Sequence, residues 1–489
     1  MVCVVSCPAA AQQRTAVPAK ADPQAVLTRL LGTEGKPQDW AWLALRATGD
    51  KELLPLLEAL AKSGDVRLRQ FAVACLAEIA GKEAAPALAD RLANDSENSI
   101  RVDALVALVA AGAQTPDLLR AALASNDEQI RCIAARALVN LNHLDDARPA
   151  LCALIESKDL PTAAISRMSL LAAGNAEMLE PLRKIFRDPK AEPALVVLLI
   201  EQAGEQKIKA AMPLLEDALA ASHTDDLMRV RAFRAMSAMD DAIGPRLGKA
   251  ISDSDNRTFQ CLMMRVLAER ADAEASLKRL AREKELPGVL ARVELARRAE
   301  GFAGLADPLA EAMALGHPIV IEYVLDCAKN DVKKNPRASD AYTPALLAFV
   351  ESVPRDEARM TREHIQAAMA VKWLAELASP RAVEGLKKLA AGRYDAVLRL
   401  TATGLYKSDN LALASELAAP LLASAYPDIQ QDAALTLGRN GDKRATAMLE
   451  AIVADSNSNP ALQTSAAWYL LKIQGKTAQA VQELARQVK

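Results

Sequence analysis

The sequence has few aromatic residues and few histidines. Phe, Trp and Tyr together make up only 3% of the 489 residues, and there are four histidines. Those histidines lie far apart, and none is followed by Glu. None of the seven cysteines is paired in the C-x-x-C spacing that is typical of zinc and redox sites. The sequence therefore indicates no metal centre and no cofactor.

An excess of one charge sign and a long apolar run are also missing. Lys and Arg number 60 against 62 Asp and Glu, which gives a formal net charge of −2. Nucleic-acid binders usually carry a basic excess, because neutralised phosphates supply most of the affinity. A transmembrane helix needs roughly eighteen or more consecutive apolar residues, and no run approaches that length. We therefore consider a nucleic-acid partner unlikely and expect no transmembrane segment.

Apolar residues at helical spacing are abundant in the sequence. Hydrophobic residues make up 51% of the chain, and most of them are Ala, Leu and Val. The stretch from Lys51 to Gly81 is typical. It predicts two helices joined by the turn Ser63-Gly64-Asp65, because its apolar residues recur at the spacing of one helix face. The predicted first helix carries Leu53, Leu54, Leu56, Leu57 and Leu60, and the second carries Phe71, Ala72, Cys75, Leu76 and Ile79.

This unit resembles the HEAT-repeat family. That family's pattern is a Leu-Leu-Pro-Leu-Leu helix, an Asp-containing turn and a second helix that opens on Val-Arg. The corresponding residues here are Leu53 to Leu57, Asp65 and Val66-Arg67, and the second-helix opening recurs at Ile100-Arg101, Ile130-Arg131 and Val230-Arg231. The resemblance implies an all-α, right-handed α-solenoid (superhelix) of about thirteen antiparallel helical hairpins.

The repeats set the predicted organisation of the chain. Second helices are expected to begin near residues 66, 98, 128, 161, 190, 226, 256, 287, 317, 357, 395, 427 and 459. We expect the array to extend well beyond about 100 Å along the superhelix, since each hairpin adds roughly 10 Å. Residues 1–23 read as a signal-like or disordered segment and linker, 24–50 as capping helices, 51–330 as the main array, 331–360 as an irregular insertion, and 361–489 as C-terminal repeats with a polar capping helix.

The turn residues are predicted to be structural. Asp65 is expected to cap a helix N-terminus. Arg67, Arg101, Arg131 and Arg231 are expected to bridge to acceptors in the adjacent repeat, with ligand binding as the alternative.

The N-terminal segment and the cysteines concern localisation. Val4 to Cys7 resembles a bacterial lipobox, with Cys7 as the lipidated residue, and the Ala9 to Ala11 stretch could equally be a signal-peptidase site. Both interpretations lack a basic n-region. They favour a periplasmic or membrane-anchored protein over a cytoplasmic one. Most other cysteines are expected to be buried free thiols, and a Cys132–Cys152 disulfide is the alternative.

The predicted function is a non-enzymatic scaffold that binds a protein partner on its concave face, since no catalytic constellation stands out. One alternative is an enzyme or a lyase-like prosthetic-group handler on the same fold, with its pocket near the 331–360 insertion. The other is nucleic-acid binding through the richest basic region. Arg229, Arg231 and Arg234, at the start of one second helix, are the candidate interaction surface.

Overall fold

The structure is a computed structural model, and it describes residues 22–31, 39–221, 223–240, 242–335, 338–353, 362–392, 395–455 and 457–487. Within these ranges every regular element is an α-helix or a short 3-10 helix, and there is no β-strand. The predicted all-α solenoid is confirmed.

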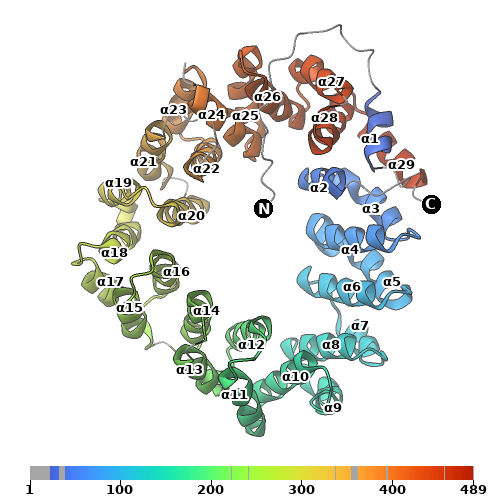
Figure 1. Cartoon of the computed structure of the whole chain (residues 1–489), viewed down its shortest axis with the longest axis vertical. Coiled ribbons are helices and arrows are strands. Elements are labelled where there is room, and N and C mark those ends of the chain that lie inside the picture. The colour runs from blue at the N-terminus through green and yellow to red at the C-terminus, as the bar shows by residue number, and fades with distance from the viewer. Residues whose placement is uncertain are drawn as a thin grey trace.

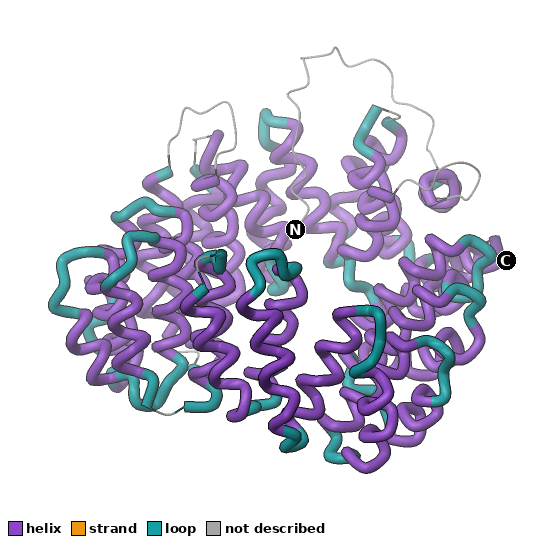
Figure 2. The backbone as a smooth tube through the Cα atoms, turned by 60° about the horizontal axis from the view of Figure 1, so that its bottom comes forward, coloured by secondary structure: helices purple, strands orange, loops and turns teal. Residues whose placement is uncertain are grey.

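Antiparallel helical hairpins follow one another along the whole chain (Figures 1 and 2). The first helix of each hairpin lies on the outside: α1 (Pro23–Leu31), α3 (Leu54–Leu60), α5 (Ala85–Asn94), α7 (Pro116–Leu123), α9 (Leu144–Leu154), α11 (Leu179–Arg187), α13 (Met212–Ala220), α15 (Gly244–Ser252), α17 (Glu274–Leu280), α19 (Ala306–Ala314), α21 (Ala338–Ser352), α23 (Pro380–Ala390), α25 (Leu411–Ala418) and α27 (Thr446–Ala454).

The second helices, with the exception of α18, line the inside: α2 (Asp39–Ala47), α4 (Val66–Ala80), α6 (Asn98–Ala110), α8 (Glu128–Asn140), α10 (Leu160–Ala172), α12 (Pro193–Glu205), α14 (Asp226–Ser237), α16 (Arg257–Ala268), α18 (Leu286–Arg298), α20 (Pro318–Lys334), α22 (Arg362–Leu377), α24 (Asp395–Lys407), α26 (Pro427–Arg439) and α28 (Pro460–Ile473). The last helix is α29 (Thr477–Gln487). The expected second-helix starts lie within three residues of these, except for the one near residue 357, which is outside the described residues.

A recurring turn explains why the second helices begin where they do. Ser63 Oγ accepts the Asp65 N–H at 3.2 Å, and Asp65 Oδ1 accepts the Arg67 N–H at 2.8 Å. The side-chain oxygens thus bond N–H groups that precede and open the helix, where no backbone acceptor exists. The same Ser-x-Asp or Ser-x-Asn arrangement recurs at Ser125-Asn126-Asp127, Ser157-Lys158-Asp159, Ser254-Asp255-Asn256 and Ser408-Asp409-Asn410.

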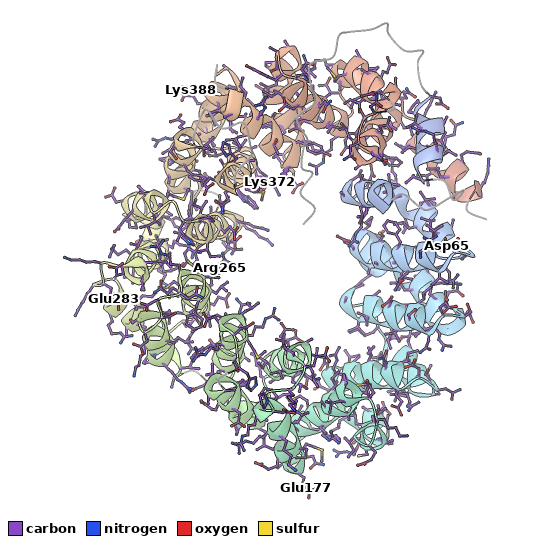
Figure 3. The ribbon with its side chains drawn as sticks, viewed as in Figure 1. Asp65, Glu177, Arg265, Glu283, Lys372 and Lys388 are labelled. Carbon is purple, nitrogen blue, oxygen red and sulfur yellow. The ribbon has the colours of Figure 1, made fainter. Side chains whose placement is uncertain are left out.

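The array closes into a ring, which the sequence analysis did not predict (Figure 1). The N-terminal helices α1 and α2 pack on α28, and the last helix α29 packs on α3. One hydrophobic core runs through this seam, since it contains buried residues from both ends of the chain, including Leu27, Leu56, Trp468 and Leu484. The described side chains leave the middle of the ring open (Figure 3).

The composition of α28 gives the physical reason for closure. All nine residues from Gln463 to Leu471 are buried, and Trp468 is fully so. A helix that is buried on every side must have neighbours on every side, and here α1 and α2 supply the side that α26 and α27 leave uncovered. The C-terminal segment is also not a free cap, because Ala480, Val481 and Leu484 of α29 are buried.

The stretch 331–360 is not the predicted irregular loop where the structure describes it. It contains the end of the 17-residue helix α20 and the 15-residue helix α21. Longer helices thus account for the wide repeat interval here. Asp331, which was predicted to lie in a charged loop, is instead buried. Arg297 and Tyr342 donate hydrogen bonds to its carboxylate and so compensate for its burial. Residues 354–361 lie outside the described residues.

Helix α18 departs from the regular pattern. Helix α20 contacts α16 directly as well as α22, and α18 lies farther out (Figure 1). The residues from Leu286 to Ala291 are consequently all buried. The wall of the ring is therefore thicker at α16, α18 and α20.

Candidate interaction surface of the ring

The inner helices present one solvent-accessible stripe each toward the opening. On α14 this stripe holds Leu227, Arg231 and Arg234, at the i, i+4, i+7 spacing of one helix face, and the C-cap residue Ala238 continues it. The opposite face is buried against α12, α13 and α16. Because Figure 1 places α14 on the inner side, this stripe faces the opening.

Ion pairs link neighbouring inner helices along this surface. Arg231 of α14 pairs with Glu201 of α12. Arg265 of α16 pairs with Asp326 of α20 at 2.7 Å and lies over the Tyr323 ring, 5.6 Å from its centroid. Figure 3 shows Arg265 and Lys372 on the inner side, whereas Glu177, Glu283 and Lys388 lie on the outside. The inner surface is thus mixed in charge and partly neutralised by its own pairs.

A tryptophan adds an aromatic element to the inner surface. Trp373 of α22 is partly exposed, with Lys329 of α20 and Lys372 on its ring, their Nζ atoms 5.3 and 5.0 Å from its centroid. Lys372 also pairs with Glu376 at 3.4 Å. The Lys329 contact joins α20 to α22, and the three side chains form an amphipathic patch on these inner helices.

The three predicted interaction residues do not form one cluster. Arg231 and Arg234 share the inner stripe of α14, but Arg229 lies about 200° away from Arg231 around the helix. Arg229 instead lies 3.8 Å from Asp226 at the helix start. Arg234 is exposed and makes no ion pair with any residue in the described ranges.

The turn arginines differ from the prediction in their partners. Asp65 caps α4 as expected, and the Arg67 side chain beside it lowers the pKa of its carboxyl. Arg101 bonds to Asn98 and Arg131 to Ser125 O, both within their own hairpins, and Arg67 bonds to Asp65 of the turn before its helix. Of the four, Arg231 bridges to the adjacent repeat as predicted.

Other arginines make the bridges between repeats. Arg69, only 7% exposed, donates two bonds to Asp95 at 2.9 and 3.0 Å. At the ends of second helices, Arg270, Arg298 and Arg439 donate to backbone carbonyls about thirty residues earlier, among them Ser237 O, Ala268 O and Ser408 O. These carbonyls close the preceding second helix, where a positive charge is favourable.

A buried polar cluster joins α18, α20 and α21. Arg297 bonds to both Glu294 and Asp331 at 2.6–2.7 Å, Tyr323 donates to Glu294, and Tyr342 donates to Asp331 at 2.7 Å. Burial, followed by the charge of Glu294, raises the pKa of Tyr323 well above its usual value. The cluster is enclosed and its carboxylates are bonded by protein groups. Its chemistry is that of a structural tie rather than a substrate site.

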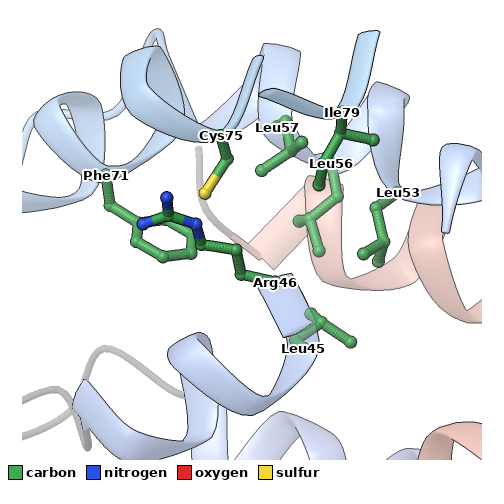
Figure 4. A pocket seen from close by; sticks show the side chains of 8 residues that line it. All are labelled: Leu45, Arg46, Leu53, Leu56, Leu57, Phe71, Cys75 and Ile79. Atoms are coloured by element: carbon green, nitrogen blue, oxygen red, sulfur yellow. The ribbon is translucent and has the colours of Figure 1, made fainter. Parts of the chain in front are cut away.

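The described parts of the chain contain a small pocket but no cluster of metal-ligating side chains. No group of three or more His, Cys, Asp or Glu side chains there could hold a metal ion. An apolar cavity of about 10 Å³ lies between α2, α3 and α4 and has room for about one water molecule (Figure 4). It is lined by Leu45, Arg46, Leu53, Leu56, Leu57, Phe71, Cys75 and Ile79.

The described residues include five of the seven cysteines, and all five are free thiols. Cys132 and Cys152 are free thiols, so the alternative of a disulfide between them is wrong. Cys132 is buried, and its thiol lies 3.8 Å from Ser166 Oγ. Cys7 lies outside the described residues, and so does the expected signal-like segment up to residue 21. None of the described helices is long and apolar enough to cross a membrane.

Comparisons with known proteins agree with the repeat interpretation. A family model described as HEAT repeats matches residues 24–109. No curated protein matches the sequence. Among solved structures, the fold is similar to that of Kap121p, with 14% identity and a TM-score of 0.41 over 92% of this chain and 56% of that chain. This chain therefore spans little more than half the length of Kap121p.

Two further solved structures show similarity over most of this chain. One is the Kap95:Nup1 complex, with 12% identity, a TM-score of 0.34, and coverage of 93% of this chain and 67% of that chain. The other is UNC-45 from Drosophila melanogaster, with 14% identity, a TM-score of 0.28, and coverage of 93% and 78%. At these identities the similarity concerns the fold alone. The family model thus identifies HEAT repeats at residues 24–109, and helical hairpins continue from there through the described residues to close the ring.

Proposed function

We propose that the chain is a non-enzymatic scaffold that holds a protein partner against the inner surface of its ring. The observation that carries the proposal is the inner surface itself, where α14, α16, α20 and α22 each present a stripe of mixed apolar and charged side chains. Arg234, Lys329 and Trp373 belong to it. A surface that mixes aromatic, aliphatic and charged groups of both signs is typical of protein–protein interfaces.

The charge pattern supports a protein partner over a nucleic acid. A phosphate backbone calls for several unpaired cations along one path. Here Arg231, Arg265 and Lys372 are each neutralised by a carboxylate. The lack of convergent titratable groups beside a sizeable pocket in the described ranges likewise supports a binding role over an enzymatic one.

The test compares charge reversals on the two sides of the ring. The tagged full chain is expressed in its native host, and proteins recovered with it are quantified for the parent and for each variant. Arg234→Glu and Lys329→Glu reverse exposed charges on the inner surface. Lys184→Glu, on the outer helix α11, is the matched control because this lysine is also exposed.

We expect a stoichiometric protein partner to be lost with the inner variants and retained with Lys184→Glu. Equal loss with the inner and outer variants would contradict an inner binding surface. Recovery of nucleic acid that falls steeply between about 50 and 200 mM salt would favour the nucleic-acid alternative. If only the outer variant lost the partner, the binding surface would be the outside of the ring.

A further inference from the structure

The repeat that closes the ring is built from both ends of the chain. On the inside, α2 fills the place between α28 and α4, and on the outside α1 and α29 lie between α27 and α3 (Figure 1). Along the rest of the array, consecutive segments form each hairpin. This closing repeat is therefore the one place where two ends without a covalent connection must meet.

The surfaces that meet at the seam are complementary and different from each other. The N-terminal side offers Val26, Leu27 and Leu31 of α1, and the C-terminal side offers the apolar helix α28 with Trp468. In the second part of the seam, Val481 and Leu484 of α29 cover α3. One chain thus carries both halves of a head-to-tail interface, and any second copy carries the same two halves.

The polar contacts that Gln24, Arg29 and Asp50 make across the seam are long. Gln24 Nε2 lies 3.4 Å from Ala480 O, Arg29 Nη2 lies 3.5 Å from Gln463 Oε1, and Lys472 Nζ lies 3.6 Å from Asp50 Oδ2. Several bridges within the array are shorter, such as the Arg439 bond to Ser408 O at 2.8 Å. Apolar packing therefore supplies most of the seam's stability. No polar contact across it would have to change if the two sides came from different copies.

We propose that the seam is an exchangeable interface whose second partner is another copy of this chain. When the ring opens, α1 and α2 of one copy pack on α28 of the other, and α29 packs on α3 in the same reciprocal way. The product is a closed head-to-tail dimer with every seam contact retained. Within one chain the ends face each other at an effective concentration of about millimolar, so the closed monomer prevails in dilute solution. This inference is independent of what the inner surface binds.

The experiment uses the full chain with cysteines placed on the two sides of the seam. In a background with Cys3, Cys7 and Cys152 replaced by Ser, Asp50→Cys and Lys472→Cys are made together and separately. The double variant should be crosslinked within the monomer by a short bismaleimide. The two single variants are mixed at high concentration, warmed to just below the unfolding transition, cooled and then crosslinked. Light scattering after size exclusion gives the mass of each product.

The matched control is an ion pair of the same kind inside the array. Lys51 and Glu83 lie 3.4 Å apart and join adjacent repeats. Lys51→Cys and Glu83→Cys should crosslink in the double variant. The mixture of the two single variants should give no covalent dimer, because a continuous array does not exchange there. Circular dichroism verifies that each variant keeps its helical content.

We expect the mixed seam variants to give a covalent dimer of twice the monomer mass, in a fraction that rises with protein concentration. A seam double variant that crosslinks within the monomer, together with a mixture that gives no dimer at any concentration, would overturn the proposal. Failure of the double variant to crosslink at all would overturn it too, since the seam would then not be formed. Equal dimer from the Lys51 and Glu83 mixture would show nonspecific association and would also count against it.

Discussion

Arg29 of α1 donates a hydrogen bond to Gln463 of α28 across 434 residues of sequence, at 3.5 Å. This contact places the first and last hairpins side by side. It lies at the edge of an apolar core that contains residues from both ends. Stability at the seam must therefore depend on its apolar residues more than on this bond.

Replacing Trp468 should weaken both the last hairpin and ring closure. Its side chain is fully buried in the core shared by the two chain ends. Trp468→Ala is expected to cost about 3–5 kcal/mol, since a large buried aromatic side chain is removed. Urea unfolding followed by circular dichroism would measure the loss, and small-angle X-ray scattering would report an increased radius of gyration if the ring opens. An unchanged transition midpoint would contradict the packing described for α28.

Substitutions at two neighbouring residues of α29 distinguish the effect of lost packing from the effect of an added charge. Val481 is 1% exposed, whereas Gln482 is on the solvent side. Val481→Asp should destabilise the seam by about 2–4 kcal/mol, because it buries a carboxylate without a partner. Gln482→Asp introduces the same group in water and should change the stability by less than about 0.5 kcal/mol. Thermal unfolding of the two variants under the same conditions gives the comparison, and equal effects would exclude packing of α29 against α3.

Arg67 and Arg69 give a second matched pair. The Asp95 side chain is only 1% exposed and accepts both bonds from Arg69. Arg69→Ala should cost about 1.5–3 kcal/mol, since it removes two charge-assisted hydrogen bonds from a buried carboxylate that keeps Arg91 at 3.2 Å. Arg67 pairs with Asp65 at the surface, so Arg67→Ala should cost less than about 1 kcal/mol. Urea titrations of both variants test this, and a larger loss for Arg67→Ala would favour the role that the sequence predicted for it.

The contrast between Arg67 and Arg69 shows which features a single sequence predicts. The hairpins and their boundaries could be predicted because helical periodicity and capping turns are local. Which of two arginines reaches the next repeat could not, because residues two apart point about 200° away from each other around a helix. The answer depends on how adjacent hairpins rotate.

Closure of the ring could not be predicted from the sequence for a related reason. It results from the sum of small rotations between successive repeats, and no single residue records that sum. One local signal did exist in α28. After Ser465, the residues from Ala466 to Leu471 carry no charged side chain on any side of the helix. A terminal helix of this kind indicates that something covers its outer face. Helical periodicity alone also predicts that Arg231 and Arg234 share a face and that Arg229 lies away from them, so that separation could have been found in the sequence.

The reactivity of the cysteine thiols toward a maleimide should depend on their burial. Cys152 is exposed, whereas Cys75, Cys132, Cys261 and Cys327 are buried. Burial raises the pKa of Cys75 and of Cys261 to about 12, so these thiols lack the reactive thiolate at neutral pH. In a Cys3→Ser, Cys7→Ser background, one thiol should react with a maleimide in the native protein and five after denaturation. Mass spectrometry counts the labels, and rapid native labelling of Cys75 would contradict its enclosed position.

Asp432 should make the free energy of unfolding depend on pH between about pH 4 and 6, and substitution by Asn should remove this dependence. Burial raises the pKa of this carboxyl from 3.8 to about 6, although Thr403 donates a hydrogen bond to it at 2.6 Å. Between about pH 4 and 6 the folded state therefore holds this proton while the unfolded state has lost it. Because the folded state binds more protons there, this residue's contribution to the free energy of unfolding falls as pH rises and levels off above pH 6.

Asp432→Asn isolates this contribution from that of the other carboxylates. Asp65, Asp90 and Glu216 have lowered pKa values and affect stability in the opposite direction, but they are common to both proteins. The free energy of unfolding of the variant relative to the parent should therefore rise from pH 4 to pH 6 and then stay constant. Urea unfolding at half-unit pH intervals measures the difference. A difference that is flat across this range would show that Asp432 ionises as an ordinary surface carboxylate, and one that falls would mean that its charged form stabilises the fold.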